Sequence, residues 1–448
     1  MTPVPLDIPL PLPADRLLLE ALLVFAFLAH LLFVNLMLGG LLVALWAERR
    51  GWREPRWDAL ARAIAATVTV NKSMAVVLGV APLLCINALY AVWFYSANAL
   101  TGSVWILIVP LVTAAFLLAY LWKYSWTALA RSRGLHFAIG AASAAILLFV
   151  PLIFETDVNL MLFPDRWGEV RGFLGALQLP NVLPRALHFL LASLAFTGFA
   201  GLLWFTRASF PLERDLPGFS RAELRRFFYG LGFGATLAQG LVGPLVLFTL
   251  PAAGQGWLML GLLLLGVLAA ALALGLTWRE LLAPDARIGR SFLPILLLLG
   301  VTVGCMGYAR HLYREHALAP HARLVAERSA AYRVAVAAAA QAGASGSAAA
   351  PAPDPGQELF ESTCAACHAL DAPLVGPPVT EIASIYAGNP EGIVAWVRAP
   401  GRKRPGSAPM PAFPLPEERL RAVAGWLLQA GAAAAAPLAA EPTAEPSP

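Results

Sequence analysis

Two cysteines and a histidine near the C-terminus have the spacing of a haem attachment site. They form the run Cys364-Ala365-Ala366-Cys367-His368, which is a C-x-x-C-H motif. Thiols separated by two residues on a helical turn can add to the two vinyl groups of one porphyrin, and His368 would then lie under the iron. A zinc site would need a second ligand pair nearby, and a thioredoxin-like pair would need a βαβ pattern. Neither surrounds the motif, so the sequence predicts one covalently bound haem c.

The motif opens a compact segment, residues 357–430, which resembles a class I cytochrome c domain. The segment also contains the runs GPP and APMPAF and a final amphipathic stretch, PEERLRAVAGWLLQ. The resemblance implies that His368 and Met410 are the two axial ligands of the haem c iron. It also implies that Pro377 orients His368 and that Trp426 packs where the terminal helices cross. The alternative for Met410 is a methionine that only packs in a loop.

The composition predicts that these groups are carried by a membrane protein. Of 448 residues, 59% are hydrophobic and 13% are charged, about half the charged share of a soluble domain. Because the net charge of +5 comes from short basic clusters between apolar runs, the chain does not resemble a nucleic-acid-binding protein. We expect an all-α fold, in which a polytopic transmembrane bundle of about eight helices precedes the small α-helical cytochrome c domain. The expected spans are 17–46, 64–95, 103–122, 136–154, 183–206, 228–250, 257–277 and 291–309.

The domain organisation follows from where the apolar runs end. Residues 1–311 are expected to form the transmembrane domain. Residues 312–356 are expected to be a helical extension followed by a flexible Ala/Gly/Ser/Pro linker. Residues 431–448, after the cytochrome c domain, are of low complexity and are expected to be disordered.

Basic residues predict how the bundle is oriented. Arginine and lysine concentrate in the first, third, fifth and seventh connections, and the even connections have few of them. The positive-inside rule makes the odd connections cytoplasmic. The chain is then a multi-pass protein of the bacterial inner membrane, with both termini and the cytochrome c domain on the periplasmic side. This side agrees with haem c, which is attached outside the cytoplasm.

Two histidines fall inside expected spans. His30 lies near the middle of the first span, and His188 lies about five residues into the fifth. Ionisable residues inside a membrane are functional candidates, and haem iron is a frequent partner of imidazole in electron-transfer proteins. For His30, a hydrogen bond from Asn87 across the bundle is the alternative.

The remaining histidines near the membrane carry less specific predictions. His136, at the cytoplasmic edge, is either an interfacial residue or a proton-handling group. His311, His316 and His321 follow the eighth span and are expected on a wetted interfacial helix.

The spans that carry His30 and His188 resemble subunit I of cytochrome bd quinol oxidases. The similar stretches are EALLVFAFLAHLLFVNLMLGG, the region around His136, and NVLPRALHFLLASLAFTG. The resemblance implies one or two b haems, with His30 and His188 as iron ligands. It pairs His188 with a methionine of a later span, for which Met259 is the best match and Met306 a weaker one.

The chain also departs from that family. The outer connection between the sixth and seventh spans, where the family builds its quinol site, is only PAAGQG. Asn87 and Ala114 stand where the family has glutamates, and Trp257 stands where it has an arginine. Those glutamates serve oxygen reduction and its proton supply. The departures therefore argue against oxygen reduction, and against quinol oxidation in the family's manner.

The sequence thus predicts a membrane-bound respiratory electron-transfer cytochrome. Electrons would pass between a membrane donor, quinol or another, and a periplasmic redox protein by way of haem b and haem c. One alternative is a terminal oxidase subunit fed by cytochrome c, and another is a membrane-anchored cytochrome c without intramembrane haem. Whether the chain is an oxidoreductase subunit linked to quinol or to oxygen, and whether further membrane subunits join it, stays open.

Overall fold

The computed structural model describes residues 12–345, 354–401 and 410–435, without the side chains of residues 69–73 and 339–345. Within these residues every regular element is helical, which confirms the predicted all-α fold. Contacts divide the chain into two compact units, Met1–Arg333 and Val334–Pro448. The N-terminal residues 1–11, the linker residues 346–353 and the tail residues 436–448 lie outside the description, so the predictions made for them are not tested.

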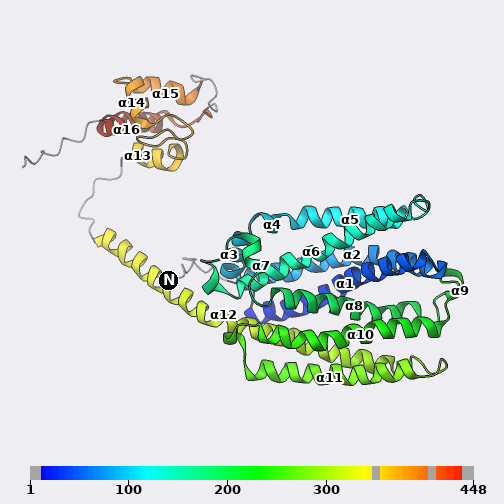
Figure 1. Cartoon of the computed structure of the whole chain (residues 1–448). Coiled ribbons are helices and arrows are strands. Elements are labelled where there is room, and N and C mark those ends of the chain that lie inside the picture. Colours follow the sequence, from blue (N-terminus) through cyan, green and yellow to red (C-terminus); the bar gives the residue numbers. More distant parts are fainter. Residues whose placement is uncertain (1–11, 346–353, 402–409, 436–448) are drawn as a thin grey trace, which may run out of the picture. The chain divides into compact units, whose positions relative to one another are not determined.

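The first unit is a bundle of long helices that run alternately up and down (Figure 1). Among the residues that the structure describes, seven helices are long and apolar enough to cross a membrane, and a bent pair can provide an eighth span, in agreement with the sequence. The helices are α1 (Arg16–Gly51), α2 (Pro55–Leu89), α3 (Ala91–Thr101), α4 (Ser103–Ile106), α5 (Ile108–Tyr124), α6 (Arg133–Met161), α7 (Gly172–Leu177), α8 (Val182–Phe205), α9 (Leu212–Asp215), α10 (Arg221–Phe248), α11 (Trp257–Leu282) and α12 (Phe292–Ser345).

The second span differs from its prediction as one helical span over 64–95. Helix α2 begins nine residues earlier and ends at Leu89, and the chain bends by 109° into α3. The stretch has no glycine or proline at the bend, so the sequence gives no sign of it. Tyr90 lies at the corner, only 3% exposed, and its hydroxyl donates to Glu315 of α12. Tertiary contacts therefore hold a bend that the local sequence does not encode.

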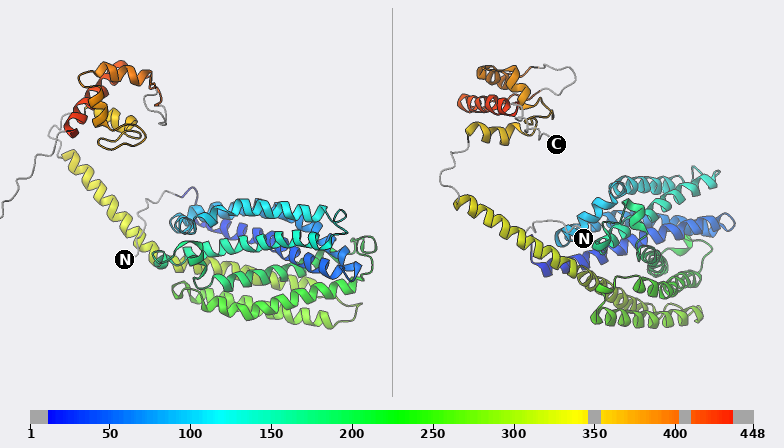
Figure 2. Two further views of the ribbon diagram at one scale, coloured as in Figure 1. Left: turned by 45° about the horizontal axis from the view of Figure 1, so that its top comes forward. Right: turned by 60° about the vertical axis from the view of Figure 1, so that its left-hand side comes forward.

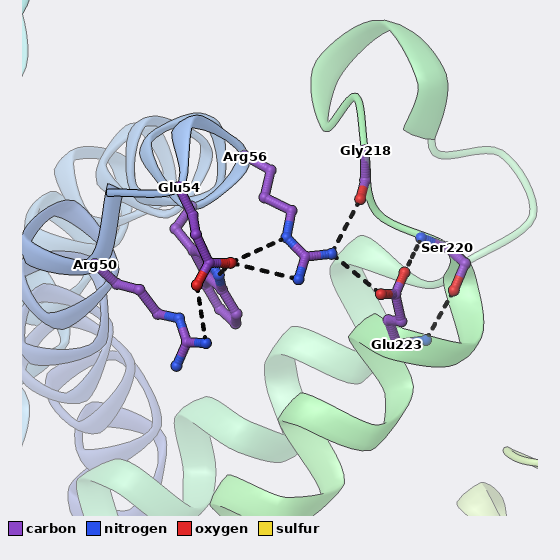
Figure 3. A network of polar contacts seen from close by, with 7 residues as sticks. Arg50, Glu54, Arg56, Gly218, Ser220 and Glu223 are labelled. Atoms are coloured by element: carbon purple, nitrogen blue, oxygen red, sulfur yellow. Dashed lines mark hydrogen bonds and ion pairs between the residues drawn. The ribbon is translucent and has the colours of Figure 1, made fainter. Parts of the chain in front are cut away.

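The four odd connections meet at one end of the bundle, here called the basic end (Figure 2). The Arg56 guanidinium, just after the first connection, lies 3.1 Å from Glu223 of α10, near the fifth (Figure 3). In the third connection, Trp126 donates to Asp58 of α2 at 3.1 Å. Arg226 of α10 lies 2.6 Å from Asp285 of the seventh connection. Partly exposed ion pairs and a hydrogen bond thus connect the basic residues and their neighbours at this end.

One carboxylate in this layer collects several donors. The Trp57 indole N–H donates to Glu54 at 3.0 Å, and the guanidinium groups of Arg50 and Arg56 lie beside the same carboxylate (Figure 3). The Trp57 hydrogen bond and then the two positive charges hold the pKa of Glu54 below its usual range. Since the group is exposed, these contacts contribute little to stability but fix how the first connection turns.

Helix α12 is one continuous helix of 54 residues. The predicted domain boundary at residues 311 and 312 therefore falls inside a helix, which also contains Pro320. The prediction that all three histidines of this region are wetted is wrong for two of them. His311 and His321 are 7% and 5% exposed, because α12 still packs on the bundle there, and only His316 is exposed.

The second unit contains a small bundle of four helices, α13 (Pro355–Leu359), α14 (Val379–Ile385), α15 (Pro390–Arg398) and α16 (Glu417–Ala435). Its apolar core joins Leu359 and Phe360 to Val379 of α14, Ile393 of α15 and Leu420 of α16. Helix α16 extends through residues 431–435, which the sequence placed in a disordered tail. Alanine has the highest helix propensity, so the Ala-rich end continues the helix.

Helices α1 and α8 approach each other closely at a glycine. A Cβ at Gly39 would lie 2.2 Å from the Ser193 carbonyl oxygen and 2.3 Å from the Thr197 hydroxyl. Ser193 also donates to Asn35 Oδ1 at 2.9 Å. Small residues let two membrane helices pack backbone to backbone, and the polar pair adds a hydrogen bond across the contact.

Gly39→Ala should therefore separate α1 and α8 and lower the free energy of unfolding by about 1–3 kcal/mol. The matched control is Gly240→Ala in α10, where a Cβ would meet nothing within 4 Å. Thermal unfolding in detergent measures both variants. Equal midpoints for Gly39→Ala and the unsubstituted protein would contradict the close contact.

Candidate haem sites

The two motif cysteines lie on one turn that follows α13. The backbone widens over Phe360–Cys364, where the Ala365 N–H donates to the Phe360 carbonyl at 2.8 Å. The backbone N–H groups of Cys367 and His368 both donate to the Cys364 carbonyl at 3.0 Å. Burial, and then the neighbouring Cys367, raise the pKa of the Cys364 thiol. The turn thus brings the three motif side chains together without a disulfide, since both cysteines are free.

The His368 ring is held by the GPP run. Its Nδ1–H donates to the Pro377 carbonyl oxygen at 2.7 Å, so Nε2 carries the lone pair. A Cβ at Gly376 would lie 2.3 Å from His368 Cε1, and the Gly376 N–H donates to the Cys367 carbonyl at 2.8 Å. A histidine that ligates a metal usually donates its other ring nitrogen to a carbonyl in this way. The orienting role that the resemblance implied for Pro377 has the geometry it requires.

The motif opens into one cavity of about 370 Å³. Its wall contains the motif residues Cys364, Cys367 and His368, and also Met410, which lies 42 residues after His368 in the sequence. The rest of the wall is largely apolar and includes Ile382, Tyr386, Trp396, Val397 and Phe413. Four groups that can hold a porphyrin and its iron thus share one largely apolar cavity, which fits a covalently attached haem.

The terminal helices of this unit cross in contact. The rings of Phe360 and Trp426 are 4.6 Å apart between centroids. A Cβ at Gly356 would lie 2.2 Å from the Ala422 carbonyl oxygen, so only glycine allows the helices to approach this closely. Trp426 therefore packs at the crossing, as the resemblance implied.

The helical fold and this cavity define a c-type cytochrome domain, and comparisons with known proteins agree. Residues 351–427 match the family described as cytochrome c oxidase, cbb3-type, subunit III. Cytochrome c-551 of Azotobacter vinelandii is 35% identical over 79 residues, which cover 17% of this chain and 96% of that protein. Cytochrome c-551 of Ectopseudomonas mendocina is 35% identical over 77 residues, 16% of this chain and 94% of that protein. Through this domain the chain belongs to the cytochrome c-551 family, which implies covalently bound haem c.

In the membrane unit, His30 has the same arrangement as His368. Its Nδ1–H donates to the Ala75 carbonyl oxygen of α2 at 2.8 Å, and a Cβ at Gly79 would lie 2.9 Å from its Cε1. Within the described residues no hydrogen bond reaches its Nε2. Asn87, the alternative partner, is not bound to His30, and its Oδ1 has no partner there either. The residues present fit an imidazole whose Nε2 faces a ligand.

His188 has no hydrogen bond among the described residues, and its Nδ1 is buried. The charge of Glu155 on α6 acts on the ring. Met259, its predicted partner, is 1% exposed and packs in an apolar cluster with Ala309 and Tyr313 of α12. Met306 lies against Gly266, where a Cβ would come within 3.2 Å of its methyl group. Met259 thus remains the better match, and its pairing with His188 remains a prediction.

The two intramembrane histidines lie at the same depth. Helices α1 and α8 both run toward the basic end (Figure 1), and their contact joins Asn35 to Ser193. His30 and His188 each precede the contact residue of their own helix by five positions. Five residues turn a side chain by about 140°, so both rings point away from the α1–α8 contact. The two histidines therefore face different surroundings, as two separate haem sites would require.

Sequence reasoning missed the partner of His136. This ring is 4% exposed, so the side chain is buried within the protein, and its position at the membrane interface stays a prediction. Its Nδ1 lies 2.7 Å from Glu48 Oε1, and its Nε2–H donates to the Trp122 carbonyl at 2.8 Å. The Trp122 indole donates to the other Glu48 oxygen at 2.8 Å. A glutamate at the end of an apolar span was the signal, and a proton-handling role for the pair stays a prediction.

Proposed function

We propose that this chain is a membrane-bound respiratory electron-transfer cytochrome. It would pass electrons between quinol, or another membrane donor, and a periplasmic redox protein by way of haem b in the bundle and haem c in the C-terminal domain. The observation that carries the proposal is the arrangement of His30, which repeats that of His368: Nδ1–H on a carbonyl, Nε2 without a partner, and a glycine against the ring. One chain thus combines a cytochrome c domain with a second histidine, in an expected membrane span, whose ring has the same hydrogen bond and the same glycine contact.

In the C-terminal domain, we assign covalent attachment to Cys364 and Cys367 and the axial positions to His368 and Met410. The attached group supplies one-electron Fe(III)/Fe(II) chemistry. The Pro377 carbonyl keeps the imidazole tautomer that offers Nε2 to the metal. The wall of the cavity is largely apolar, and a thioether ligand favours the ferrous state.

The orientation we propose puts the basic end in the cytoplasm and both chain termini on the periplasmic side of the bacterial inner membrane. The positive-inside rule supports this, since the basic residues of the odd connections pack together at one end. Attachment of haem c outside the cytoplasm supports the same side for the C-terminal domain.

A second candidate function is that of a subunit in a terminal oxidase, fed by a soluble cytochrome c. The matched family description, cytochrome c oxidase, cbb3-type, subunit III, favours it. Asn87 and Ala114 in place of carboxylates argue against an oxygen-reducing site in this chain itself. A haem count per chain and an oxygen-uptake assay separate the functions. Haem c alone would indicate a simple anchor, one or two b haems without oxygen uptake an electron-transfer subunit, and oxygen uptake an oxidase.

The double variant Cys364→Ala/Cys367→Ala should lose covalent haem completely, since both thioether links are removed. The measurement is a haem stain on a denaturing gel. The matched control is Cys85→Ala/Cys305→Ala, which removes the two cysteines of the membrane unit and should keep the stain. A full stain in the first variant would refute the attachment site.

Met410→Ala should leave haem c attached but lower its reduction potential, because the thioether ligand that favours Fe(II) is gone. An optical redox titration measures the change, and the haem b potential in the same sample is the control. If the haem c potential stays where it was, another residue occupies the sixth position.

His188→Ala and His30→Ala should each remove one b-type haem and leave haem c intact, because the two rings face separate surroundings. A pyridine haemochrome assay gives the ratio of haem b to haem c, expected to fall from two to one in each variant. A ratio of one in both the unsubstituted protein and His30→Ala, with lower thermal stability in the variant, would mean that His30 only bonds to Ala75 and that the chain holds a single haem b.

A further inference from the structure

Two arginines, Arg185 and Arg310, lie beside Glu155 at the end of the bundle opposite the basic end. Arg185 of α8 has its Nη2 3.0 Å from Glu155 Oε2, with both side chains largely buried. Arg310 of α12 is 4.0 Å from the other oxygen of Glu155, beyond hydrogen-bonding distance. Its guanidinium carbon lies 4.6 Å from the Phe27 ring centroid. Arg314, one turn further along α12, is 8% exposed, and its Nε has no partner among the described residues.

The neighbouring charges do not neutralise this arginine cluster, defined as Arg185, Arg310 and Arg314. Beside it, Arg16 pairs with Glu20 at 2.6 Å and with Glu315 at 2.7 Å. With Glu155, these residues are four arginines and three glutamates, so one positive charge is in excess. The nearby His311 lies 3.7 Å from Glu20 and would add positive charge if protonated.

A buried cation without a close counter-ion is strongly unfavourable, and more so within a membrane. Further polar atoms nearby also lack partners in the described structure. The Tyr313 hydroxyl is one, on a side chain only 4% exposed, and His188 Nδ1 is another. Tyr313 is within electrostatic reach of Arg185, and His188 of Glu155, so these groups belong to one region. Several buried polar groups without partners in one place indicate a ligand with complementary groups.

The position of Arg185 relative to His188 suggests which ligand this is. The two residues are three apart on α8, so they lie on the same face, with Arg185 about 4.5 Å nearer the opposite end. A haem bound through the His188 ring would extend along this face. Haem b carries two propionate carboxylates on one edge of its ring, and carboxylates pair with guanidinium groups by charge-assisted hydrogen bonds.

We propose that the arginine cluster binds the propionates of the haem b held by His188, so that the propionate edge faces the end of the bundle opposite the basic end. This inference rests on the proposed haem b at His188. The family that the bundle resembles has an arginine where this chain has Trp257. In the proposal, arginines of α8 and α12 supply the positive charge instead. Arg310 would be a cofactor-binding residue here, because it would contact the propionate edge of the haem and not the iron.

The test is Arg310→Gln in the full-length protein, with optical redox titration of both haems. A positive charge near a haem stabilises the ferrous form, which carries one positive charge fewer than the ferric form. Removal of the Arg310 charge should lower the ratio of reduced to oxidised haem b at a fixed potential at least about tenfold, a shift of about 59 mV. Haem c should keep its potential. Arg310→Lys, which retains the charge, should restore most of the haem b potential.

Arg287→Gln, at an exposed position between α11 and α12 at the basic end, is the matched control and should change neither haem. An unchanged haem b potential in Arg310→Gln would overturn the arginine proposal and leave haem b in place. Loss of haem b from both Arg310 variants, with haem c intact, would also overturn it, since packing and not charge would then matter. Unsubstituted protein without haem b would instead refute the proposed function.

Discussion

The absence of water from the bilayer core is the constraint on which this structure depends. Every polar group that a span carries inward must find a partner in the protein or in a ligand. Most do so across helix contacts, as Ser193 does with Asn35 and as His136 does with Glu48 and the Trp122 carbonyl. Several buried polar atoms have no partner among the described residues, and some of them, such as Asn87 Oδ1 and Tyr229 Oη, lie at separate places in the bundle. His188 Nδ1 and Arg314 Nε are also among them, and the proposed haem b would account for these two.

The C-terminal domain and the bundle each hold one histidine ring with a backbone carbonyl and a glycine, but different elements supply these two groups. In the C-terminal domain, a loop supplies the Pro377 carbonyl and a glycine next to it makes room for the ring. In the bundle, α2 supplies the Ala75 carbonyl, and Gly79, one turn along the same helix, makes room for His30. A carbonyl on Nδ1 fixes the tautomer and leaves Nε2 for a metal. A histidine needed only for packing would not require a glycine against its ring.

The sequence predicted what depends on local pattern and missed what depends on tertiary contact. The C-x-x-C-H motif and the GPP run are local signals, and the structure brings both to one cavity with Met410. The bend at Tyr90 could not be predicted from the neighbouring residues, because Tyr90 is held by a hydrogen bond to Glu315, which lies far along the chain on α12. Glu48 and Glu155 were overlooked for the same reason, since a carboxylate at the end of a span is read as exposed until its partner is known. Helix α16 ran past its predicted end because an Ala-rich run is both low in complexity and helix-forming.

The two ends of the bundle carry positive charge in different ways, and the difference separates topology from binding. At the basic end, arginines such as Arg56 and Arg226 have carboxylates within 3.1 Å, and their side chains remain partly exposed. Such pairs are solvated and need nothing further. At the opposite end, Arg185 and Arg314 are largely buried, and Glu155 lies within 4.0 Å of Arg185 and Arg310. Charges used only to orient a protein in a membrane would be found in water. Because these are withdrawn from water without enough carboxylates to balance them, orientation does not account for them, and a bound anion does.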